Sequence, residues 1–383
     1  MNPQRFLRLV SGAMAALGIS AAAIVALNLR GEDPLPSAET LKPTPALVAQ
    51  GEYLTRVGNC MACHTVQGGA PFAGGRGIET PFGVVYSSNL TPDKATGLGA
   101  WTSAEFWRAM HNGRGKEGRL LYPAFPYTSY THVTREDSDA IFAYLQSLPP
   151  VAQANKAHAL RFPYSTQAAL GVWRALFFTP ADVAQPAASA PQALATAQVP
   201  DYQRGAYLVN GLGHCAACHT PRNSLGAEQQ GQALAGGLIP VQNWLAPALT
   251  DAGQAGVQRW PQADVVALLK TGVAPQASVI GPMAEVVFRS TQYLSDADAR
   301  AMAVYLQALP QHAATPAKQA VAPASVMERG AKVYEAQCAQ CHGAQGQGAK
   351  DEAGQPAFPP LAGNRAVVLA DPTNLVRVVL QGG

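Results

Sequence analysis

The sequence predicts a mostly α-helical protein built from three small tandem domains. One observation is that a Cys-x-x-Cys-His motif occurs three times and uses all six cysteines of the 383-residue chain. The other is that each motif follows a short helical segment of similar pattern, and such an internal repeat defines the domains. These opening segments are Gly51-Glu52-Tyr53-Leu54, Gly205-Ala206-Tyr207-Leu208 and Gly330-Ala331-Lys332-Val333-Tyr334.

The three motifs predict covalently attached c-type haem. In this motif two thiols bond to the vinyl groups of one haem, and the adjacent histidine reaches the iron as proximal ligand. A zinc site would need two Cys-x-x-Cys pairs about 12 to 20 residues apart, whereas these pairs lie more than a hundred residues apart. We therefore expect haem attachment at Cys60, Cys63, Cys215, Cys218, Cys338 and Cys341, with iron bound by His64, His219 and His342.

Composition agrees with a string of small domains. The length allows about two to four of them. Charged residues make up 13% of the chain, and the net charge of +3 is spread without a basic cluster. Nothing in this pattern favours binding to nucleic acid.

The N-terminal segment 1–33 is expected to direct export. Arg5 and Arg8 precede an apolar run from Leu9 to Leu29, which ends at Arg30. The run is about long enough to cross a bilayer, and no good small-x-small cleavage site stands at its polar end. We expect an uncleaved anchor, with a cleaved signal peptide as the alternative, and in either case the haem domains leave the cytoplasm.

The first two repeats also share the elements that follow the motif. Gly-rich loops follow the motif at 72–75 and 234–237, and a middle helix is expected after Trp101 or Trp260. Thr134 and Ser295 are expected N-caps of a closing helix, in front of acidic residues that complement the helix dipole. Tyr144 and Tyr305 on these closing helices are placed to pack on the opening helix. Prolines stop them at 149 and 310.

The sixth iron ligand is most clearly predicted in the second repeat. Met283 lies in a Pro-containing loop, well beyond His219 and shortly before Ser295. A thioether favours Fe(II), raises the potential and closes the iron to oxygen or peroxide. We therefore expect Met283 to be a ligand rather than core filler.

The first repeat departs from this pattern. Phe125 occupies the equivalent place between His64 and Thr134, and a phenyl ring cannot bind iron. His132 is our first choice as ligand, Met110 the second and an open site the third. Met110 reads mainly as a core residue, and His111 is expected on the solvated face of its helix.

The third repeat stops early. The chain ends at Gly383, soon after the motif that contains His342, and no methionine follows Met327. We expect a truncated domain that lacks its closing helix. Ala/Pro-rich linkers are expected at about 181–200 and 311–324, and the apolar segment 162–178 is expected to be a buried strap between the first two domains or a surface for a partner.

Several further motifs strengthen one resemblance. The chain resembles the tri-haem cytochrome c subunits of bacterial membrane-bound dehydrogenases from about residue 45 to its end. The motifs are Asn89-Leu90-Thr91-Pro92-Asp93, Tyr122-Pro123-Ala124-Phe125-Pro126-Tyr127, Trp173-Arg174-Ala175, Leu234-Ala235-Gly236-Gly237, Asn243-Trp244, Gly281-Pro282-Met283-Ala284-Glu285-Val286-Val287 and Phe358-Pro359-Pro360-Leu361-Ala362-Gly363-Asn364. In this family the position of Phe125 is often methionine.

The resemblance implies tandem class I cytochrome c-like domains joined by Ala/Pro-rich linkers, the third incomplete. We expect a signal-anchor at 1–33, domain 1 at 45–150, a strap and linker at 151–200, domain 2 at 201–310, a linker at 311–324 and domain 3 at 325–383.

The resemblance also implies an electron-transfer subunit without catalysis of its own, on the periplasmic side of the inner membrane. Such subunits accept electrons from a catalytic dehydrogenase partner of the quinoprotein, flavoprotein or molybdenum type, which oxidises alcohols, aldehydes or sugar acids. They pass the electrons to ubiquinone or a terminal oxidase. The alternative is a peroxidase-like haem enzyme with an open first haem, for which His111 and His132 are the acid/base candidates between His64 and Thr134.

Overall fold

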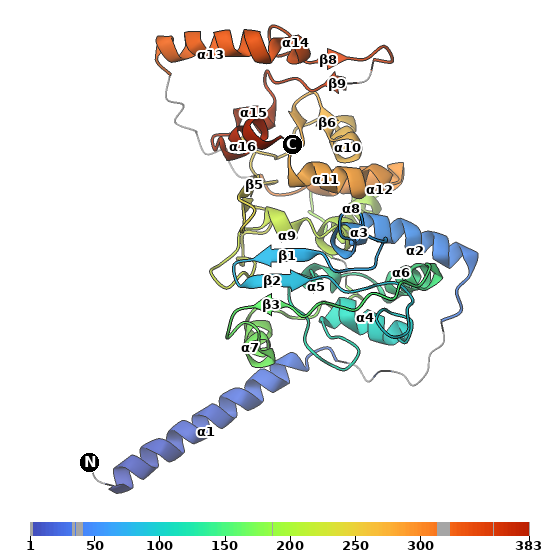
Figure 1. Ribbon diagram of the computed structural model, residues 1–383, viewed down its shortest axis with the longest axis vertical. Helices are drawn as coiled ribbons and strands as arrows, with labels where there is room; N and C mark the ends of the chain where they lie inside the picture. Colours follow the sequence, from blue (N-terminus) through green and yellow to red (C-terminus); the bar gives the residue numbers. More distant parts are fainter. Residues whose placement is uncertain are drawn as a thin grey trace. The chain divides into compact units, whose positions relative to one another are not determined.

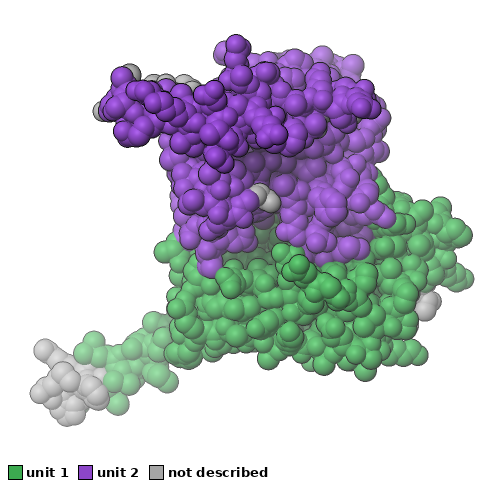
Figure 2. All heavy atoms as spheres, turned by 45° about the horizontal axis from the view of Figure 1, so that its top comes forward, with its two compact units in different colours: residues 1–54, 63–185, 224–227 green, residues 55–62, 186–223, 228–383 purple. Residues whose placement is uncertain are grey.

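Short helices dominate the computed structural model, which describes residues 3–32, 35, 41–185, 187–311, 322–354 and 356–382. Strands within these ranges form one three-stranded and three two-stranded sheets. The predicted mostly helical fold is confirmed (Figure 1). Two compact units divide the chain, one of residues 1–54, 63–185 and 224–227, the other of residues 55–62, 186–223 and 228–383 (Figure 2).

Unit 1 contains the N-terminal helix and most of the first repeat. Strand β2 lies between β1 and β3 in an antiparallel sheet, in which Val84 pairs with both Glu79 and Ala159. Residues 55–62 belong to unit 2, so unit boundaries fall within helices α2 and α3. The elements, from the N-terminal helix onward, are α1 (Pro3–Asn28), α2 (Pro45–Val57), α3 (Cys60–His64), β1 (Gly77–Thr80), β2 (Gly83–Tyr86), α4 (Ser103–Asn112), α5 (Tyr127–Tyr130), α6 (Arg135–Ser147), β3 (Ala159–Leu160) and α7 (Gln167–Phe177).

Unit 2 contains the second repeat in the same order of helices. Its elements are η1 (Thr196–Gln198), α8 (Val199–Tyr207), the π-helical turn η2 (Leu208–Leu212), α9 (Ala216–His219), β4 (Gly237–Ile239), β5 (Trp244–Ala246), α10 (Gln262–Thr271), β6 (Val273–Ala274), β7 (Ala277–Ser278), α11 (Pro282–Arg289), η3 (Thr291–Tyr293) and α12 (Asp296–Gln307).

The third repeat also belongs to unit 2. Within this repeat, the Asn374 side chain forms two hydrogen bonds with the backbone of Leu245 in β5. It accepts from the Leu245 N–H at 2.8 Å and donates to the Leu245 carbonyl at 2.7 Å. Asn364 is fully buried and donates to the Ser278 hydroxyl at 2.9 Å. The elements are α13 (Ala324–Gln337), α14 (Ala339–His342), β8 (Ala349–Lys350), β9 (Pro356–Phe358), α15 (Arg365–Val368) and α16 (Thr373–Gln381).

Opening and closing helices cross at a glycine in both complete repeats. A Cβ atom added to Gly51 in α2 would lie 2.6 Å from the Ala140 carbonyl carbon and 2.8 Å from the Tyr144 Cβ in α6. A side chain larger than hydrogen does not fit there, so the glycine lets the two helices approach closely. The predicted packing of Tyr144 on the opening helix is confirmed. Tyr305 packs in the same way, because its Cβ lies 2.8 Å from the position of a Cβ on Gly205.

The predicted helix starts are also confirmed. The Thr134 hydroxyl accepts from the Asp137 N–H at 3.2 Å, and the Ser295 hydroxyl accepts from the Asp298 N–H at 3.1 Å. Each N-cap thereby satisfies one of the N–H groups that the first helical turn leaves unpaired. Middle helix α4 begins at Ser103, shortly after Trp101.

The segment 162–178 contains helix α7, which belongs to unit 1 and packs against α1. Leu170 and Phe178 are buried, whereas Phe162, Val172 and Leu176 are exposed to solvent. The linker predicted at 311–324 lies mostly outside the described residues, which omit 312–321.

Candidate haem-binding sites

The imidazole of His64 is held by a backbone carbonyl. His64 ends the short helix α3, and its Nδ1 lies 2.7 Å from the Ser88 carbonyl oxygen. A carbonyl oxygen only accepts hydrogen bonds, so the Nδ1 must carry the proton and donate it. The Nε2 of a neutral imidazole then keeps its lone pair and can bind a metal ion.

The other two motifs repeat this arrangement. His219 Nδ1 donates to the Pro247 carbonyl at 2.7 Å, and His342 Nδ1 donates to the Pro359 carbonyl at 2.9 Å. Each histidine thus follows a pair of cysteine thiols on one short helical segment and presents Nε2 as the unprotonated nitrogen. This donor set of two thiols and one oriented imidazole fits a haem attached through thioether bonds.

A glycine closes the loop after each motif. The N–H groups of Gly74, Gly236 and Gly348 donate to the carbonyl oxygens of His64, His219 and His342 at 2.8, 2.7 and 2.8 Å, respectively. Each of these glycines has a positive φ, of 76°, 78° and 77°. Residues with a Cβ rarely adopt this backbone conformation, so the turn favours glycine.

The same glycines also make room for the carbonyl that orients the histidine. A Cβ on Gly74 would lie 2.7 Å from the Asn89 nitrogen, directly after Ser88. A Cβ on Gly236 would lie 2.6 Å from the Ala248 nitrogen, directly after Pro247. On Gly348 it would lie 2.8 Å from the Pro360 nitrogen, directly after Pro359. Each histidine is therefore held in two ways: its backbone carbonyl accepts from the glycine N–H, and its ring Nδ1 donates to a carbonyl packed against that glycine.

Comparison with known proteins identifies the family of this chain. The model of the cytochrome c family matches residues 48–149, 202–310 and 327–380, one segment around each motif. The chain belongs to the cytochrome c family. This membership implies covalently bound haem c, with which the three motifs agree.

Several relatives of this cytochrome are named as subunits of dehydrogenases. The chain is 39% identical to the cytochrome c subunit of an alcohol dehydrogenase (quinone) from Gluconacetobacter polyoxogenes, over 90% of this chain and 74% of the relative. It is 39% identical to the gluconate 2-dehydrogenase cytochrome c subunit of Pantoea cypripedii, over 88% and 77%. It is 36% identical to the fructose dehydrogenase cytochrome subunit of Gluconobacter japonicus, over 90% and 74%.

Burial keeps the proximal groups of this cytochrome uncharged. It lowers the pKa of His64 and of His219, and the backbone acceptors of their Nδ1 protons oppose this shift only in part. Burial also raises the pKa of the Cys215 thiol to about 12, with the neighbouring Cys218 adding to the shift. Both histidines are thus neutral at neutral pH, as iron ligation requires.

Met283 lies in the first turn of helix α11 and is half-buried. Gly281, the residue before the helix, has a φ of 56°, and a Cβ on it would lie 2.8 Å from the Trp244 indole. Trp244 begins strand β5, which leads to Pro247, the acceptor for His219. The segment 244–247 therefore contacts both the proximal histidine and the turn before the expected Met283 ligand.

The candidates in the first repeat occupy three different environments. Met110 is buried on α4, at 5% exposure. His132 is half-buried just after α5, and burial lowers its pKa. Phe125 packs against Tyr130, with ring centroids 5.4 Å apart. None of these observations selects a ligand, so the choice between His132, Met110 and an open site stays a prediction.

His111 is not on the solvated face, and that prediction was wrong. It is 8% exposed and stacks on the Trp107 ring at 4.5 Å. The two residues are four apart on α4, which places both rings on one face, and the large indole covers the imidazole.

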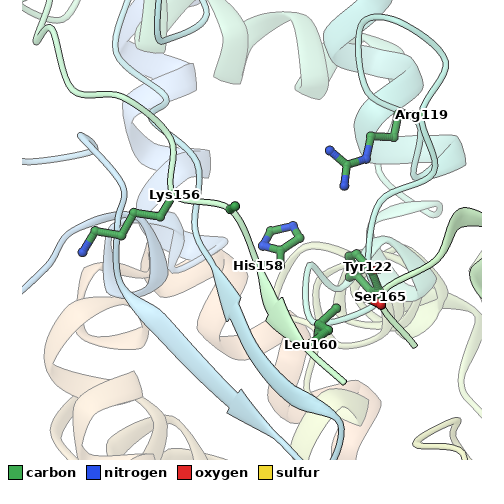
Figure 3. Close-up of a pocket in the computed structure, with 7 residues that line it drawn as sticks. Arg119, Tyr122, Lys156, His158, Leu160 and Ser165 are labelled. Carbon is green, nitrogen blue, oxygen red and sulfur yellow. The ribbon is translucent and has the colours of Figure 1, made fainter. Parts of the chain in front are cut away.

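A small pocket in unit 1 shows how the loop before Phe125 is fixed (Figure 3). His158 Nδ1 accepts from the Tyr86 N–H at 3.1 Å, and the edge-on Tyr122 ring lies 5.2 Å away. The Tyr122 hydroxyl donates to the Tyr164 carbonyl at 2.8 Å. Burial and then the positive charge of Arg119 lower the pKa of His158, so its imidazole is neutral and can accept. The segment 156–165 therefore joins strand β2 to the loop that contains Phe125.

Proposed function

We propose that this cytochrome relays electrons from a catalytic dehydrogenase subunit to ubiquinone or a terminal oxidase. The observation that supports this most directly is the threefold arrangement of two thiols beside an imidazole whose Nδ1 proton is bound to a backbone carbonyl. Haem c bound at such sites supplies reversible one-electron exchange between Fe(III) and Fe(II). We assign attachment to Cys60, Cys63, Cys215, Cys218, Cys338 and Cys341.

The chain's own residues set the properties of each site. Hydrogen bonds to Ser88, Pro247 and Pro359 fix the orientation of the three imidazoles and raise their basicity as ligands. Met283 in the second repeat adds a soft thioether, which favours Fe(II) and excludes small ligands. These features suit electron transfer rather than chemistry on a substrate.

The partner is the subunit that oxidises the substrate. Relatives named as cytochrome c subunits of alcohol, gluconate and fructose dehydrogenases support a catalytic dehydrogenase partner. Quinoprotein, flavoprotein and molybdenum enzymes all fit such a partner. The rival function, a peroxidase-like catalyst at the first haem, needs an acid/base group beside an open iron. His111 is stacked on Trp107 and buried, which leaves His132 as the candidate for that role.

Helix α1 supports a place at the membrane. Its segment Leu9–Asn28 has a mean hydropathy of 2.1, and within this segment only Asn28, at its end, is buried in the protein. By length and composition it can cross a bilayer. We propose that it stays attached as an anchor, with the haem domains on the periplasmic side.

The test uses membranes from cells that produce this cytochrome together with its dehydrogenase. Alcohols, gluconate and fructose are added in turn, and the haem α band is followed in a stopped-flow spectrometer. One of these or a related substrate should reduce the haems at least as fast as oxygen is consumed. Cys215→Ser with Cys218→Ser should abolish this respiration, whereas Met327→Leu, at an exposed side chain, should not. Haem reduction slower than oxygen uptake, or peroxide consumption instead, would contradict the relay.

A further inference from the structure

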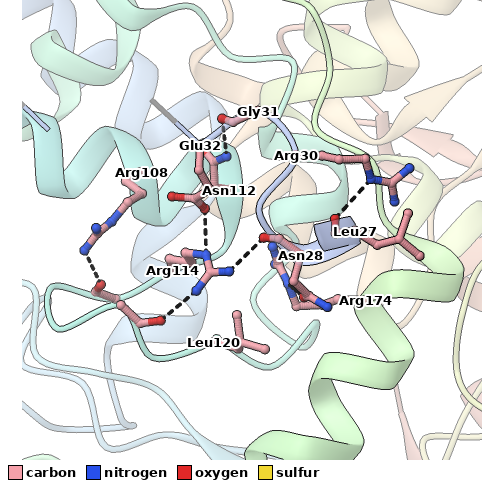
Figure 4. A network of polar contacts seen from close by, with 12 residues as sticks. Leu27, Asn28, Arg30, Gly31, Glu32, Arg108, Asn112, Arg114, Leu120 and Arg174 are labelled. Atoms are coloured by element: carbon pink, nitrogen blue, oxygen red, sulfur yellow. Dashed lines mark hydrogen bonds and ion pairs between the residues drawn. The ribbon is translucent and has the colours of Figure 1, made fainter. Parts of the chain in front are cut away.

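Helix α1 does not end in a loose linker. Asn28, its last residue, is 8% exposed, although residues 9–27 of the helix are exposed apart from the half-buried Ile24. Its Nδ2 donates to the Gly171 carbonyl of α7 at 2.8 Å. Its Oδ1 accepts from Arg174 Nε at 3.1 Å, and the two side chains lie beside each other in Figure 4. The end of the anchor is thereby fixed to helix α7 of the first domain.

The next residues extend this polar network. Arg114 donates to the Asn28 carbonyl at 2.7 Å and forms an ion pair with Glu32 at 2.6 Å. Asn112 Nδ2 donates to the Gly31 carbonyl at 2.7 Å. The side chains of Arg114 and Glu32 are each 15% exposed, so this pair is shielded from water. Residues 28–32 therefore fold as part of the first domain.

Helix α7 has two contrasting faces. Leu170, Arg174 and Phe178 recur every four residues and are buried, with the Arg174 guanidinium 4.7 Å from the centre of the Phe178 ring. Ala168, Val172 and Leu176 also recur every four residues and are exposed, the last two at 42% and 61%. Phe162, shortly before the helix, is 83% exposed. Exposed apolar side chains grouped on one helix face make that face a candidate interaction surface.

The position of α1 indicates what covers this stripe. If α1 crosses the bilayer, Asn28 marks the level at which the chain leaves the hydrocarbon. Gly171, in the middle of α7, is hydrogen-bonded to Asn28, so α7 must lie at that same level. We propose that the exposed face of α7, formed by Ala168, Val172 and Leu176, together with Phe162, binds the phospholipid surface beside the anchor. This inference rests on the proposed retention of α1.

The charges around α7 agree with a lipid surface. Arg30 is exposed and donates to the Phe178 carbonyl at 3.3 Å, which places it at the end of α7. At the other end, Gln167 accepts from the Leu120 N–H at 2.9 Å and so holds the loop that contains the exposed Arg119. Cations flanking an apolar helix face are typical of helices that lie in the membrane interface, where anionic headgroups attract them.

Photochemical crosslinking in native membranes tests the proposal. The photoreactive residue p-benzoylphenylalanine is placed singly at Leu176, at Leu17 in α1 or at Ala95, and adducts are identified by mass spectrometry. Leu17 is 68% exposed on the proposed anchor. Ala95 is exposed in the loop of residues 91–99. The Leu98 carbonyl of that loop accepts a hydrogen bond from the Gln146 side chain, near the C-terminal end of α6. Ala95 is the control for random contact with lipid.

We expect phospholipid adducts at positions 17 and 176 and none at position 95. Adducts at 17 without any at 176 would overturn the lipid surface while leaving the anchor intact. Adducts at 176 that contain a protein instead would likewise overturn it, in favour of a partner surface. Loss of the peptide around Leu17 from the mature protein would show instead that the anchor is cleaved, and the α7 proposal would fall with it.

Discussion

Gly205 in helix α8 lies directly against Ala301 in helix α12. A Cβ on Gly205 would stand 2.6 Å from the Ala301 carbonyl carbon, and Gly51 stands in the same relation to Ala140 in the first domain. Because real Cβ atoms do not approach carbonyl carbons so closely, the opening and closing helices can cross only where one of them lacks a side chain. This crossing brings the two ends of each complete domain together.

We predict that Gly205→Ala destabilises the protein. The added methyl must push α8 away from α12, and overpacking of this kind costs roughly 1–3 kcal/mol. Gly330→Ala is the matched control, since Gly330 also lies in a helix, α13, and no atom stands within 4 Å of its added Cβ. It should be neutral or stabilising by up to about 1 kcal/mol. Denaturant unfolding of the two variants measures the difference, and equal stabilities would refute the proposed crossing.

The turn at Gly236 gives a second prediction. Gly236→Ala should cost stability and raise the potential of the second haem, because displacement of Pro247 weakens its hydrogen bond to His219 and lowers the basicity of that ligand. Gly231→Ala is the control, since Gly231 has a φ of 76° but no atom within 4 Å of an added Cβ. It should show only the backbone cost of about 1–3 kcal/mol. A redox titration in which both variants keep the wild-type potential would argue against the carbonyl's role.

Met283 should be the sixth ligand of the second haem. Met283→Ala should lower that potential and remove the far-red band typical of His/Met iron, because the thioether stabilises Fe(II). The thioether bonds at Cys215 and Cys218 should remain. Met327→Ala, at a side chain 63% exposed, is the control. If the visible spectrum and titration of Met283→Ala match wild type, the side chain is only filling space.

The first haem should differ from the second in its ligation. With His132 bound it should be low-spin and lower in potential, since imidazole favours Fe(III) more than thioether does. With no ligand it should be high-spin and bind carbon monoxide when reduced. Phe125→Met should convert it toward His/Met character. EPR spectra of wild type, Phe125→Met, His132→Ala and Met110→Ala decide among these. A His/Met signal besides that of the second haem, which only Met110→Ala removes, would show that our alignment of the repeats is wrong there.

Side-chain chemistry and periodicity were readable from the sequence, and backbone chemistry was not. The N-caps Thr134 and Ser295 and the packing of Tyr144 depend on local pattern, and the structure confirms them. The acceptors Ser88, Pro247 and Pro359 act through carbonyl groups, which every residue has, so no residue type marks them. Their only sequence signal is the nearby glycine, and the separation between histidine and glycine differs in all three repeats.

Contacts with other parts of the fold explain where the structure differs from the sequence-based expectations. His111 is polar and was expected in solvent, but Trp107 one turn earlier covers it. Segment 162–178 is apolar as a buried strap would be, but its helix α7 packs against α1, more than a hundred residues earlier in the chain, and leaves Val172 and Leu176 exposed. Such long-range contacts leave no trace in local periodicity.

The central claim is that all three motifs hold a haem, and the mass of the mature protein tests it most directly. The cytochrome is purified from membranes of cells that have the cytochrome c assembly machinery, denatured and extracted with acid acetone. The intact mass should exceed that of the polypeptide by three haems, and peptides containing Cys60, Cys215 and Cys338 should each retain one. A mature protein whose Cys60 or Cys215 reacts with iodoacetamide would contradict the account.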